Sequence, residues 1–359
     1  MAIGFPTKAN WAAGDILTAA QMDDLAGTVN LLQNSAYPIV AGKNALINGG
    51  MDIWQRGTSF SNPNSVYIAD RWYSVISGGM TFSQETTTVP TGAKNCMKIV
   101  AATATTFSVN QPMETLNAIQ YAGKTVTLSV QTQTSIVMPL TVQLYYSTTV
   151  DNAPGGTWTL ITSTSGGTFN GTVGSFTQNN ATYAVPSTAK SLMVLFGTNG
   201  AASGGYTLYV GQVQLELGSA ATTFSRAGGS IGGELALCQR YYETSYPVGI
   251  VLGSTGYSGN GIFANVQALA ASTAGNVAGV GGMPFNVRKR ATPTVQIWDF
   301  YGNSGGVRIE PPDVTRTGIT GVTCLETGAI QLFTFNASSA TAVTLNYGFT
   351  FNWAASAEL

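Results

Sequence analysis

Between Thr18 and Gln33 the apolar residues recur at the spacing of a helix. The segment opens with a capping-box pattern, Thr-Ala-Ala-Gln, in which hydroxyl and amide side chains satisfy free backbone N–H groups. The apolar positions that follow are 3, 4 and 3 residues apart, the a/d seam of a coiled coil, and are Met22, Leu25, Val29 and Leu32. An isolated helix this short is marginal in water. The seam therefore predicts packing either onto the next domain or against other chains, and both alternatives stay open.

After this helix, apolar and polar residues alternate, which is the period of a strand with one buried face. The alternation is clear in residues 126–131 and 140–146. Within residues 206–217 the apolar positions change parity at Gly211, which predicts a β-bulge that keeps both halves of the strand facing the core. Short strands joined by Gly-rich turns predict a jelly-roll β-sandwich over residues 41–225.

A Gly-rich segment, residues 227–233, marks a boundary before a second β unit. The clearest signal of that unit is the alternation in residues 343–353, which with residues 332–335 predicts a long antiparallel hairpin. Residues 234–242 suit a strand and a helix equally. The sequence thus predicts a mainly β chain of three parts: an N-terminal segment with a short helix (1–40), a jelly-roll β-sandwich (41–225) and a C-terminal β-sandwich-like domain (226–359).

Charge is scarce in this sequence. Only 9% of the residues are charged, against roughly 25% in an average soluble domain. The surface must be covered by uncharged polar residues, which suits a chain partly covered by neighbouring subunits. With a formal net charge of −1, the chain lacks the clustered Lys and Arg that release counterions from nucleic acid, so we predict no nucleic-acid partner. We interpret the one basic run, residues 288–290, as a solvated loop or an ion pair at a subunit interface.

Three further features bear on the compartment. The amino terminus lacks the charged start and apolar core of a secretion signal, so export by that route is not expected. Gly, Ser, Asn and Gln interrupt every uncharged stretch, so we predict no membrane insertion. The cysteines are Cys96, Cys238 and Cys324, an odd and widely spaced set that indicates a reducing compartment and small core side chains.

Histidine is absent, which removes the usual general base and the Ser-His-Asp arrangement. Residues 302–306 match G-x-S-x-G around Ser304, but a serine without a base is inert. We interpret the segment as a hairpin turn, with Asp299 and Arg308 at solvent-exposed strand positions beside it. A glycosidase needs only two carboxyl groups about 5–10 Å apart, and no spacing here indicates such a pair. We therefore predict no catalytic residue, no cofactor and no bound metal.

Sugar binding needs aromatic faces to stack on sugar rings and polar groups to bond hydroxyls. Most jelly-roll aromatics belong to the core, and Trp54 and Trp72 lie in apolar strand motifs where we expect burial. Trp158 is the better exposed candidate because it follows a Gly-rich turn. The candidate carbohydrate-binding residues are Trp158, Asp151, Asn152 and Tyr146.

Several stretches carry a family resemblance. Residues 44–57 read Asn-Ala-Leu-Ile-Asn-Gly-Gly-Met-Asp-Ile-Trp-Gln-Arg-Gly and are followed by Ala-Asp-Arg-Trp-Tyr at 69–73. Residues 213–218 read Val-Gln-Leu-Glu-Leu-Gly, residues 234–242 read Glu-Leu-Ala-Leu-Cys-Gln-Arg-Tyr-Tyr, and residues 356–359 read Ser-Ala-Glu-Leu. Residues 44–57 and 69–73 resemble the opening strand pair of the jelly-roll domain in a widespread class of bacteriophage tail and fibre proteins. Residues 213–218 and 234–242 resemble the linker to the next domain in that class, and residues 356–359 resemble its common ending.

The resemblance implies homotrimers, an N-terminal anchor and a jelly roll akin to carbohydrate-binding modules. Together with the residue patterns, it predicts a virion structural protein made in the bacterial cytoplasm, a tail-fibre or receptor-binding subunit that adheres to host-surface glycans. Residues 1–40 would attach it to other virion proteins, and the seam would join the trimer. The alternatives are a purely structural head, collar or tail-tip decoration fibre and a glycan depolymerase. The class also allows a structural calcium site, to which Asp52 and Asp70 could contribute.

Overall fold

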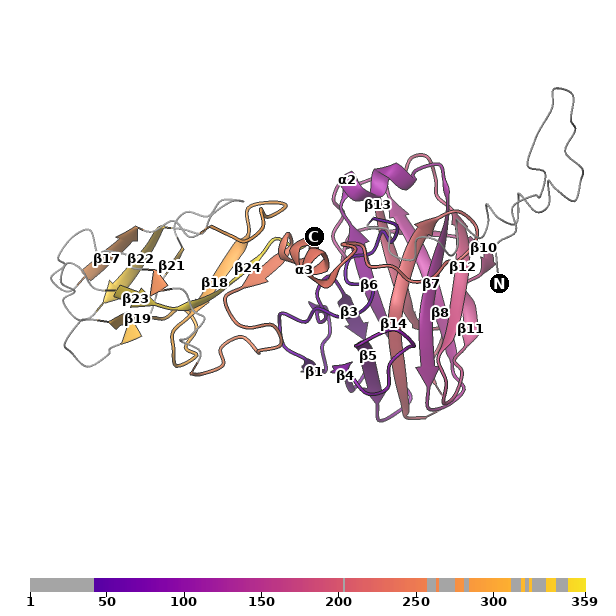
Figure 1. Ribbon diagram of the computed structural model, residues 1–359, viewed down its shortest axis with the longest axis horizontal. Helices are drawn as coiled ribbons and strands as arrows, with labels where there is room; N and C mark the ends of the chain where they lie inside the picture. The colour runs from indigo at the N-terminus through magenta and orange to yellow at the C-terminus, as the bar shows by residue number, and fades with distance from the viewer. Residues whose placement is uncertain are drawn as a thin grey trace, which may run out of the picture.

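The computed structural model describes residues 42–202, 204–256, 284–306 and 351–359 in full, and the backbone of strands between residues 263 and 350. The helix predicted over residues 18–33, its seam of Met22, Leu25, Val29 and Leu32, and the attachment segment lie outside the described residues and stay predictions. The described chain forms a β-sandwich with a distal unit of shorter sheets beside it along the long axis (Figure 1).

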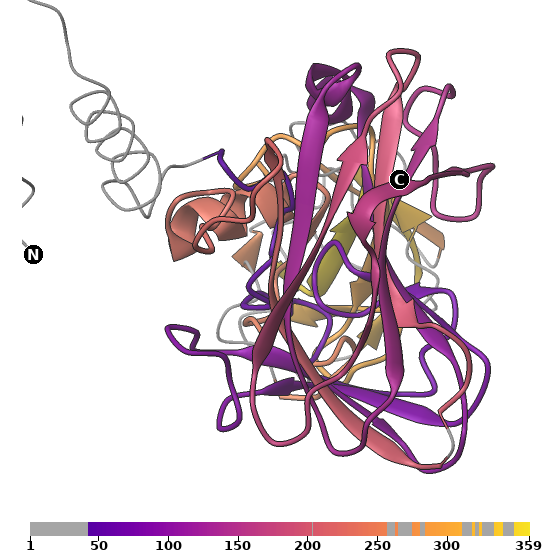
Figure 2. The ribbon, with the colours of Figure 1, turned by 90° about the vertical axis from the view of Figure 1, so that its right-hand side faces the viewer.

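Two antiparallel sheets form the sandwich (Figures 1 and 2). Sheet A contains, in spatial order, β1 (Ser59–Ser61), β4 (Met80–Glu85), β5 (Cys96–Ala101), β14 (Tyr206–Leu217), β7 (Thr125–Thr134), β12 (Thr177–Ala184) and β10 (Ser163–Gly166). Sheet B contains β11 (Thr168–Asn170), β8 (Pro139–Ser147), β13 (Ser191–Thr198), β6 (Phe107–Met113), β3 (Tyr73–Ile76) and β2 (Val66–Tyr67), and β9 (Thr159–Ile161) also pairs with β8. The predicted mainly β fold with a central jelly-roll sandwich is confirmed.

The alternating pattern places one face of each strand in the core between the sheets. In β7, Leu128 and Val130 have no exposed surface. Trp54 and Trp72 are also fully buried, as predicted. The indole Nε1 groups donate to backbone carbonyls, that of Trp54 to Met51 at 2.8 Å and that of Trp72 to Asn48 at 2.9 Å. Buried indoles need such partners, so these two tryptophans stabilise the core.

The bulge predicted in β14 is present. The register of β14 against β7 shifts between Gly211 and Gln214, and Gln212 adopts a φ of 50°. Val210 and Val213, on either side of the shift, are both buried. The extra residue therefore lets both halves of the strand face the core.

The segment 44–57 differs from the strand expected there, because it consists of turns and irregular backbone. The Asn48 side chain takes the place of a strand partner. Its Oδ1 accepts from the backbone N–H groups of Asp52 and Ile53, both at 2.9 Å, and its Nδ2 donates to the carbonyls of Ile53 and Asp70 at 2.8 and 3.1 Å. A side chain that satisfies four backbone groups makes a compact turn stable without a sheet ladder.

Two short helical segments, α2 (Thr115–Ala118) and the 3₁₀ helix η1 (Ile119–Tyr121), lie at one end of the sandwich. Residues 234–242, for which the sequence left both helix and strand open, contain both: residues 234–239 belong to helix α3 (Ile231–Gln239), and Tyr242 begins β15 (Tyr242–Thr244). The Ser230 hydroxyl caps α3 by accepting from Gly233 N–H at 3.1 Å. Cys238 on α3 packs against Ile47 and Ile53. The helix thus contacts the jelly-roll segment, and the predicted domain boundaries stay predictions.

In the described part of the distal unit, the strands form three antiparallel sheets. One contains β15, β24 (Asn352–Ser356) and β18 (Thr294–Trp298), the second β16 (Phe263–Ala264), β23 (Gly348–Thr350), β19 (Val307–Glu310) and β20 (Gly318–Ile319), and the third β17 (Gly275–Val280), β22 (Thr334–Ser339) and β21 (Thr323–Cys324). The predicted hairpin of residues 332–335 with 343–353 is wrong for the described strands. β22 pairs with β17 and β21, whereas β23 and β24 belong to two other sheets because the alternating segment is interrupted at Phe351.

A buried ionic cluster joins the distal unit to the jelly roll, and we call it the joint. The Glu358 carboxylate pairs with Arg56 at 2.9 Å and with Arg71. The Arg56 guanidinium lies 3.6 Å from the ring centroid of Tyr242, and that of Arg71 lies 3.6 Å from the centroid of Tyr241. The cluster therefore connects the end of β24 and the α3–β15 connection to the opening segment of the jelly roll.

Two remaining expectations concern cysteine and the membrane. Cys96 and Cys238 are buried, and burial raises the pKa of both thiols, so these cysteines serve as small core residues as expected. No helix in the part of the chain that the structure describes is long and apolar enough to cross a membrane.

Candidate functional site

The outer face of sheet A carries a row of uncharged polar side chains. On β7, Ser129 and Gln131 point away from the core because they alternate with buried Leu128 and Val130. Gln178 on β12 lies directly opposite Gln131. The other neighbour of Gln131 is Gly211 on β14. Within the described residues no hydrogen bond engages the side-chain amides of Gln131 and Gln178, so both can bond a ligand.

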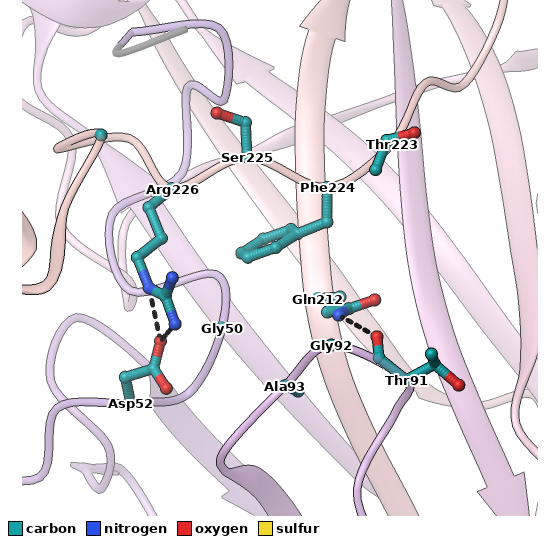
Figure 3. Close-up of a pocket in the computed structure, with 11 residues that line it drawn as sticks. Gly50, Asp52, Thr91, Gly92, Ala93, Gln212, Thr223, Phe224, Ser225 and Arg226 are labelled. Atoms are coloured by element: carbon teal, nitrogen blue, oxygen red, sulfur yellow. Dashed lines mark hydrogen bonds and ion pairs between the residues drawn. The ribbon is translucent and has the colours of Figure 1, made fainter. Parts of the chain in front are cut away.

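Gly211 allows the loop of residues 86–95 to approach this face. A Cβ at Gly211 would lie 3.1 Å from Cys96 Cβ and 3.3 Å from Pro90 Cγ, so a larger residue would push the loop away. The neighbouring Gln212, placed by the bulge, donates from Nε2 to the Thr91 carbonyl at 3.0 Å (Figure 3). The bulge predicted from sequence thus fixes one wall of a hollow on the sheet.

The second wall is the segment of residues 218–229 that follows β14. Glu216 holds it in place by accepting from the Thr222 N–H at 2.8 Å and from the Thr222 hydroxyl at 2.6 Å. Gln214 Oε1 accepts from the Ser225 N–H at 2.8 Å. These buried side chains from β14 fix the segment on the sheet and present Phe224 to the hollow.

The hollow consists of two adjoining cavities. The first has a volume of about 250 Å³ and is lined by Gly50, Asp52, Thr91, Gly92, Ala93, Gln212, Thr223, Phe224, Ser225, Arg226 and Gly229 (Figure 3). The second has a volume of about 400 Å³ and is lined by Thr91, Ser129, Gln131, Gln178, Gln212, Ala221, Thr222, Thr223 and Phe224. Thr91, Gln212, Thr223 and Phe224 line both.

One ion pair lies in the first cavity. Asp52 Oδ2 accepts from Nε and pairs with Nη2 of Arg226, both at 2.9 Å, and Asp52 Oδ1 accepts from Asn95 Nδ2 at 3.2 Å. The pair has no net charge, and every other lining residue of both cavities is uncharged. Glycoside hydrolysis needs two carboxyl groups, whereas the lining of this hollow supplies one, already bonded to a guanidinium. The arrangement suits recognition of a neutral polar molecule.

The residues singled out from the sequence lie elsewhere, at the turn that joins β8 to β9. Asp151 accepts from the Thr115 N–H at 2.8 Å and pairs with Arg290 at 3.2 Å. Asn152 is buried and donates to the Thr157 carbonyl at 2.8 Å. The half-buried Trp158 donates to the Ala153 carbonyl at 3.0 Å.

These polar groups stabilise their own turn, and Tyr146 is half-buried on β8 of sheet B. The structure brings Trp158, Asp151 and Asn152 together at that turn, but not with the hollow on sheet A. Their role in sugar binding stays a prediction. Gln212 and Phe224, which line the hollow, were missed, although the parity change at Gly211 pointed to the strand that positions them.

Asp52 and Asp70 are engaged by different arginines rather than by a shared site. Asp70 pairs with Arg56 at 3.0 Å and accepts from Gln55 at 2.9 Å, while Asp52 pairs with Arg226. Burial raises the pKa of Asp70 to about 7, and the neighbouring Arg56 only partly offsets that rise. Among the described residues no group of three or more Cys, Asp or Glu side chains is placed to hold a metal ion.

The Ser304 turn also differs in one respect from its prediction. Ser304 is exposed and its hydroxyl accepts from Gln296 Nε2 at 3.0 Å. Asp299 is buried rather than exposed, because its carboxylate accepts from the N–H groups of Tyr301 and Asn303, both at 2.9 Å, and from Asn303 Nδ2 at 2.8 Å. The carboxylate therefore closes the turn and is not directed at Ser304.

No protein-family model matches the chain, and no curated protein matches it. Among solved structures, the chain is similar to the enzymatically active domain of tailspike protein 4 of bacteriophage CBA120, with 14% identity and a TM-score of 0.33 over 49% of this chain and 21% of that chain. It is similar to a carbohydrate-binding module solved with β-1,4-galactotriose, with 9% identity and a TM-score of 0.32 over 49% of this chain and 99% of the module. It is also similar to a xylan-binding domain from Paenibacillus barcinonensis, with 15% identity and a TM-score of 0.31 over 50% of this chain and 98% of that domain.

Proposed function

We propose that this protein is a non-enzymatic structural subunit of a bacteriophage virion, in a tail fibre or receptor-binding organ, that adheres to host-surface glycans through the hollow on sheet A. The observation that carries the glycan part is a neutral hollow lined by free amides and one half-buried aromatic ring. The virion part rests on the sequence resemblance and on the scarcity of charged residues.

The chemistry of the hollow supports sugar recognition. Gln131 and Gln178 each present a donor and an acceptor, which is what paired sugar hydroxyls require. Phe224 presents an apolar ring for the apolar face of a sugar. Because both walls are bonded to β14, the site is largely formed before ligand arrives, which lowers the entropic cost of binding.

The assembly that we propose is the one predicted from the sequence. We propose a homotrimer held by the seam of Met22, Leu25, Val29 and Leu32, with residues 1–40 docking onto other virion proteins. Light scattering of the purified chain at micromolar concentration should report a trimer. A stable monomer would contradict the proposed seam.

The adhesion proposal is tested on a glycan array with the wild-type chain, Phe224→Ala and Trp158→Ala, alongside an assay for released reducing sugar. We expect binding by the wild type, a loss of about tenfold or more in Phe224→Ala, and no sugar release. Loss of binding only in Trp158→Ala would move the site to the turn at 151–158. Release of reducing sugar would instead indicate a depolymerase, and absence of any glycan binding would favour a decoration fibre.

A further inference from the structure

The two cavities of the hollow lie next to each other. They share Thr91, Gln212, Thr223 and Phe224 as a common wall. In Figure 3 the Phe224 ring projects between the Arg226–Asp52 pair on one side and Gln212 on the other. The tip of the ring reaches Gly50, where a Cβ would lie 3.5 Å from Phe224 Cζ. One aromatic ring therefore borders both spaces.

Their sizes indicate how much each can hold. Pockets for drug-sized ligands range from roughly 300 to 1,000 Å³. The first cavity, about 250 Å³, falls just below this range, and the second, about 400 Å³, lies near its lower end. Each is therefore large enough for at least one ring-sized unit, and a chain of linked rings that fills the hollow would occupy both.

The charges decide the class of unit. An acidic sugar in the first cavity would approach the Asp52 carboxylate, and to take its place on Arg226 it would have to displace that carboxylate from two contacts of 2.9 Å. Breaking a part-buried ion pair in this way leaves a charge uncompensated, which is costly. The second cavity offers no lining cation at all. An uncharged unit meets neither obstacle.

Resting on the glycan-binding function proposed above, we infer that the two cavities are consecutive subsites for neighbouring units of one uncharged sugar chain, with Phe224 beside the linkage between them. The first subsite is bordered by the small residues Gly92 and Ala93. The second has the amides of Gln131 and Gln178 for hydrogen bonding.

The experiment fills one subsite at a time. Ala93 lines only the first cavity and Ala221 only the second, so Ala93→Phe and Ala221→Phe are a matched pair. Ala201→Phe, at an exposed position in the β13–β14 loop, is the control. Calorimetric titration uses cello-, xylo-, manno- and galacto-oligosaccharides of one to four units, with oligogalacturonate as the anionic probe.

For the series that binds, we expect two units to bind at least about tenfold more tightly than one. Each filling variant should lower the affinity for the tetrasaccharide about tenfold, while Ala201→Phe leaves it unchanged. If only one filling variant weakened binding, the site would have a single subsite and the inference would fail while the proposed function stood. Neutral-sugar binding insensitive to both variants, or tighter binding of oligogalacturonate, would likewise overturn it. Binding of none of the probes would reject the proposed function itself.

Discussion

Replacing Glu358 by Gln tests whether the joint depends on a buried charge. The side chain of Glu358 is 7% exposed, and those of its partners Arg56 and Arg71 are 12% and 1% exposed. Arg56 keeps a second carboxylate, Asp70, at 3.0 Å. Arg71 keeps the Pro112 carbonyl, at 2.7 Å, and the ring of Tyr241, but among the described residues no second carboxylate pairs with it. The variant therefore leaves one guanidinium buried without a counterion.

Removing one partner of a buried ion pair costs about 3–5 kcal/mol. Gln retains the shape and one acceptor oxygen, so we expect Glu358→Gln to lower the free energy of unfolding by about 3 kcal/mol, at the low end of that range. Urea unfolding followed by tryptophan fluorescence measures the change. Lys98→Gln is the control, because its pair with Glu85 is partly exposed and should contribute less than about 1 kcal/mol.

A double variant separates the cost of the unpaired charge from the strength of the pair. Arg71→Met combined with Glu358→Leu removes both charges and keeps apolar volume, so it should be less destabilised than Glu358→Gln alone. The reasoning would be refuted if the free energy of unfolding of Glu358→Gln lay within about 0.5 kcal/mol of the wild type. It would also be refuted if the double variant were less stable than Glu358→Gln.

Three further predictions concern pH, the bulge and the serine turn. Burial raises the pKa of Asp70 from 3.8 to about 7, so its contribution to stability is present below about pH 4 and is lost as the pH rises through 7. The free energy of unfolding in urea should therefore fall with pH across this window, and Asp70→Asn should reduce that slope. An unchanged slope in Asp70→Asn would contradict the shift. Gly211→Val should cost about 1–3 kcal/mol because the added atoms meet Cys96 and Pro90; an unchanged thermal midpoint would show that the loop yields freely. Ser304→Ala should change stability by no more than about 0.5 kcal/mol and leave host adsorption unaltered; labelling of Ser304 by a fluorophosphonate probe would instead indicate a nucleophile.

Within the sandwich, the sequence was informative where one periodic pattern decides the structure, whereas the alternation in residues 343–353 predicted a hairpin that the described strands do not form. Alternation predicted the strands of the sandwich, and the parity change at Gly211 predicted the bulge, because a strand with one buried face must keep its register. Prediction from the sequence failed where side-chain hydrogen bonds to the backbone take the place of those between strands. Segment 44–57 was expected to be extended, but Asn48 bonds four backbone groups and folds it into turns.

The hollow was beyond prediction for a related reason. Its walls come from residues 50–52, 91–93, 212 and 221–229, which meet only after the sheet has formed. Trp158 was favoured as a sugar-binding aromatic because it follows a Gly-rich turn. No pattern within one segment could indicate that loops distant in sequence build a hollow on sheet A. Asp299 was misplaced for a local reason, since its burial depends on the turn that its own carboxylate closes.

The joint also has a mechanical consequence. β15 leaves the jelly roll and β24 returns to it as its antiparallel neighbour, with Tyr242 beside Ser356. A tensile load applied to the distal unit along the long axis of Figure 1 is then shared by two strands, one continued covalently through Tyr241 and the other held by Glu358 between two arginines. A single flexible linker would let the distal unit rotate relative to the jelly roll under such a load. Two anchored strands resist rotation as well as extension, so the distal unit keeps its orientation while it is pulled.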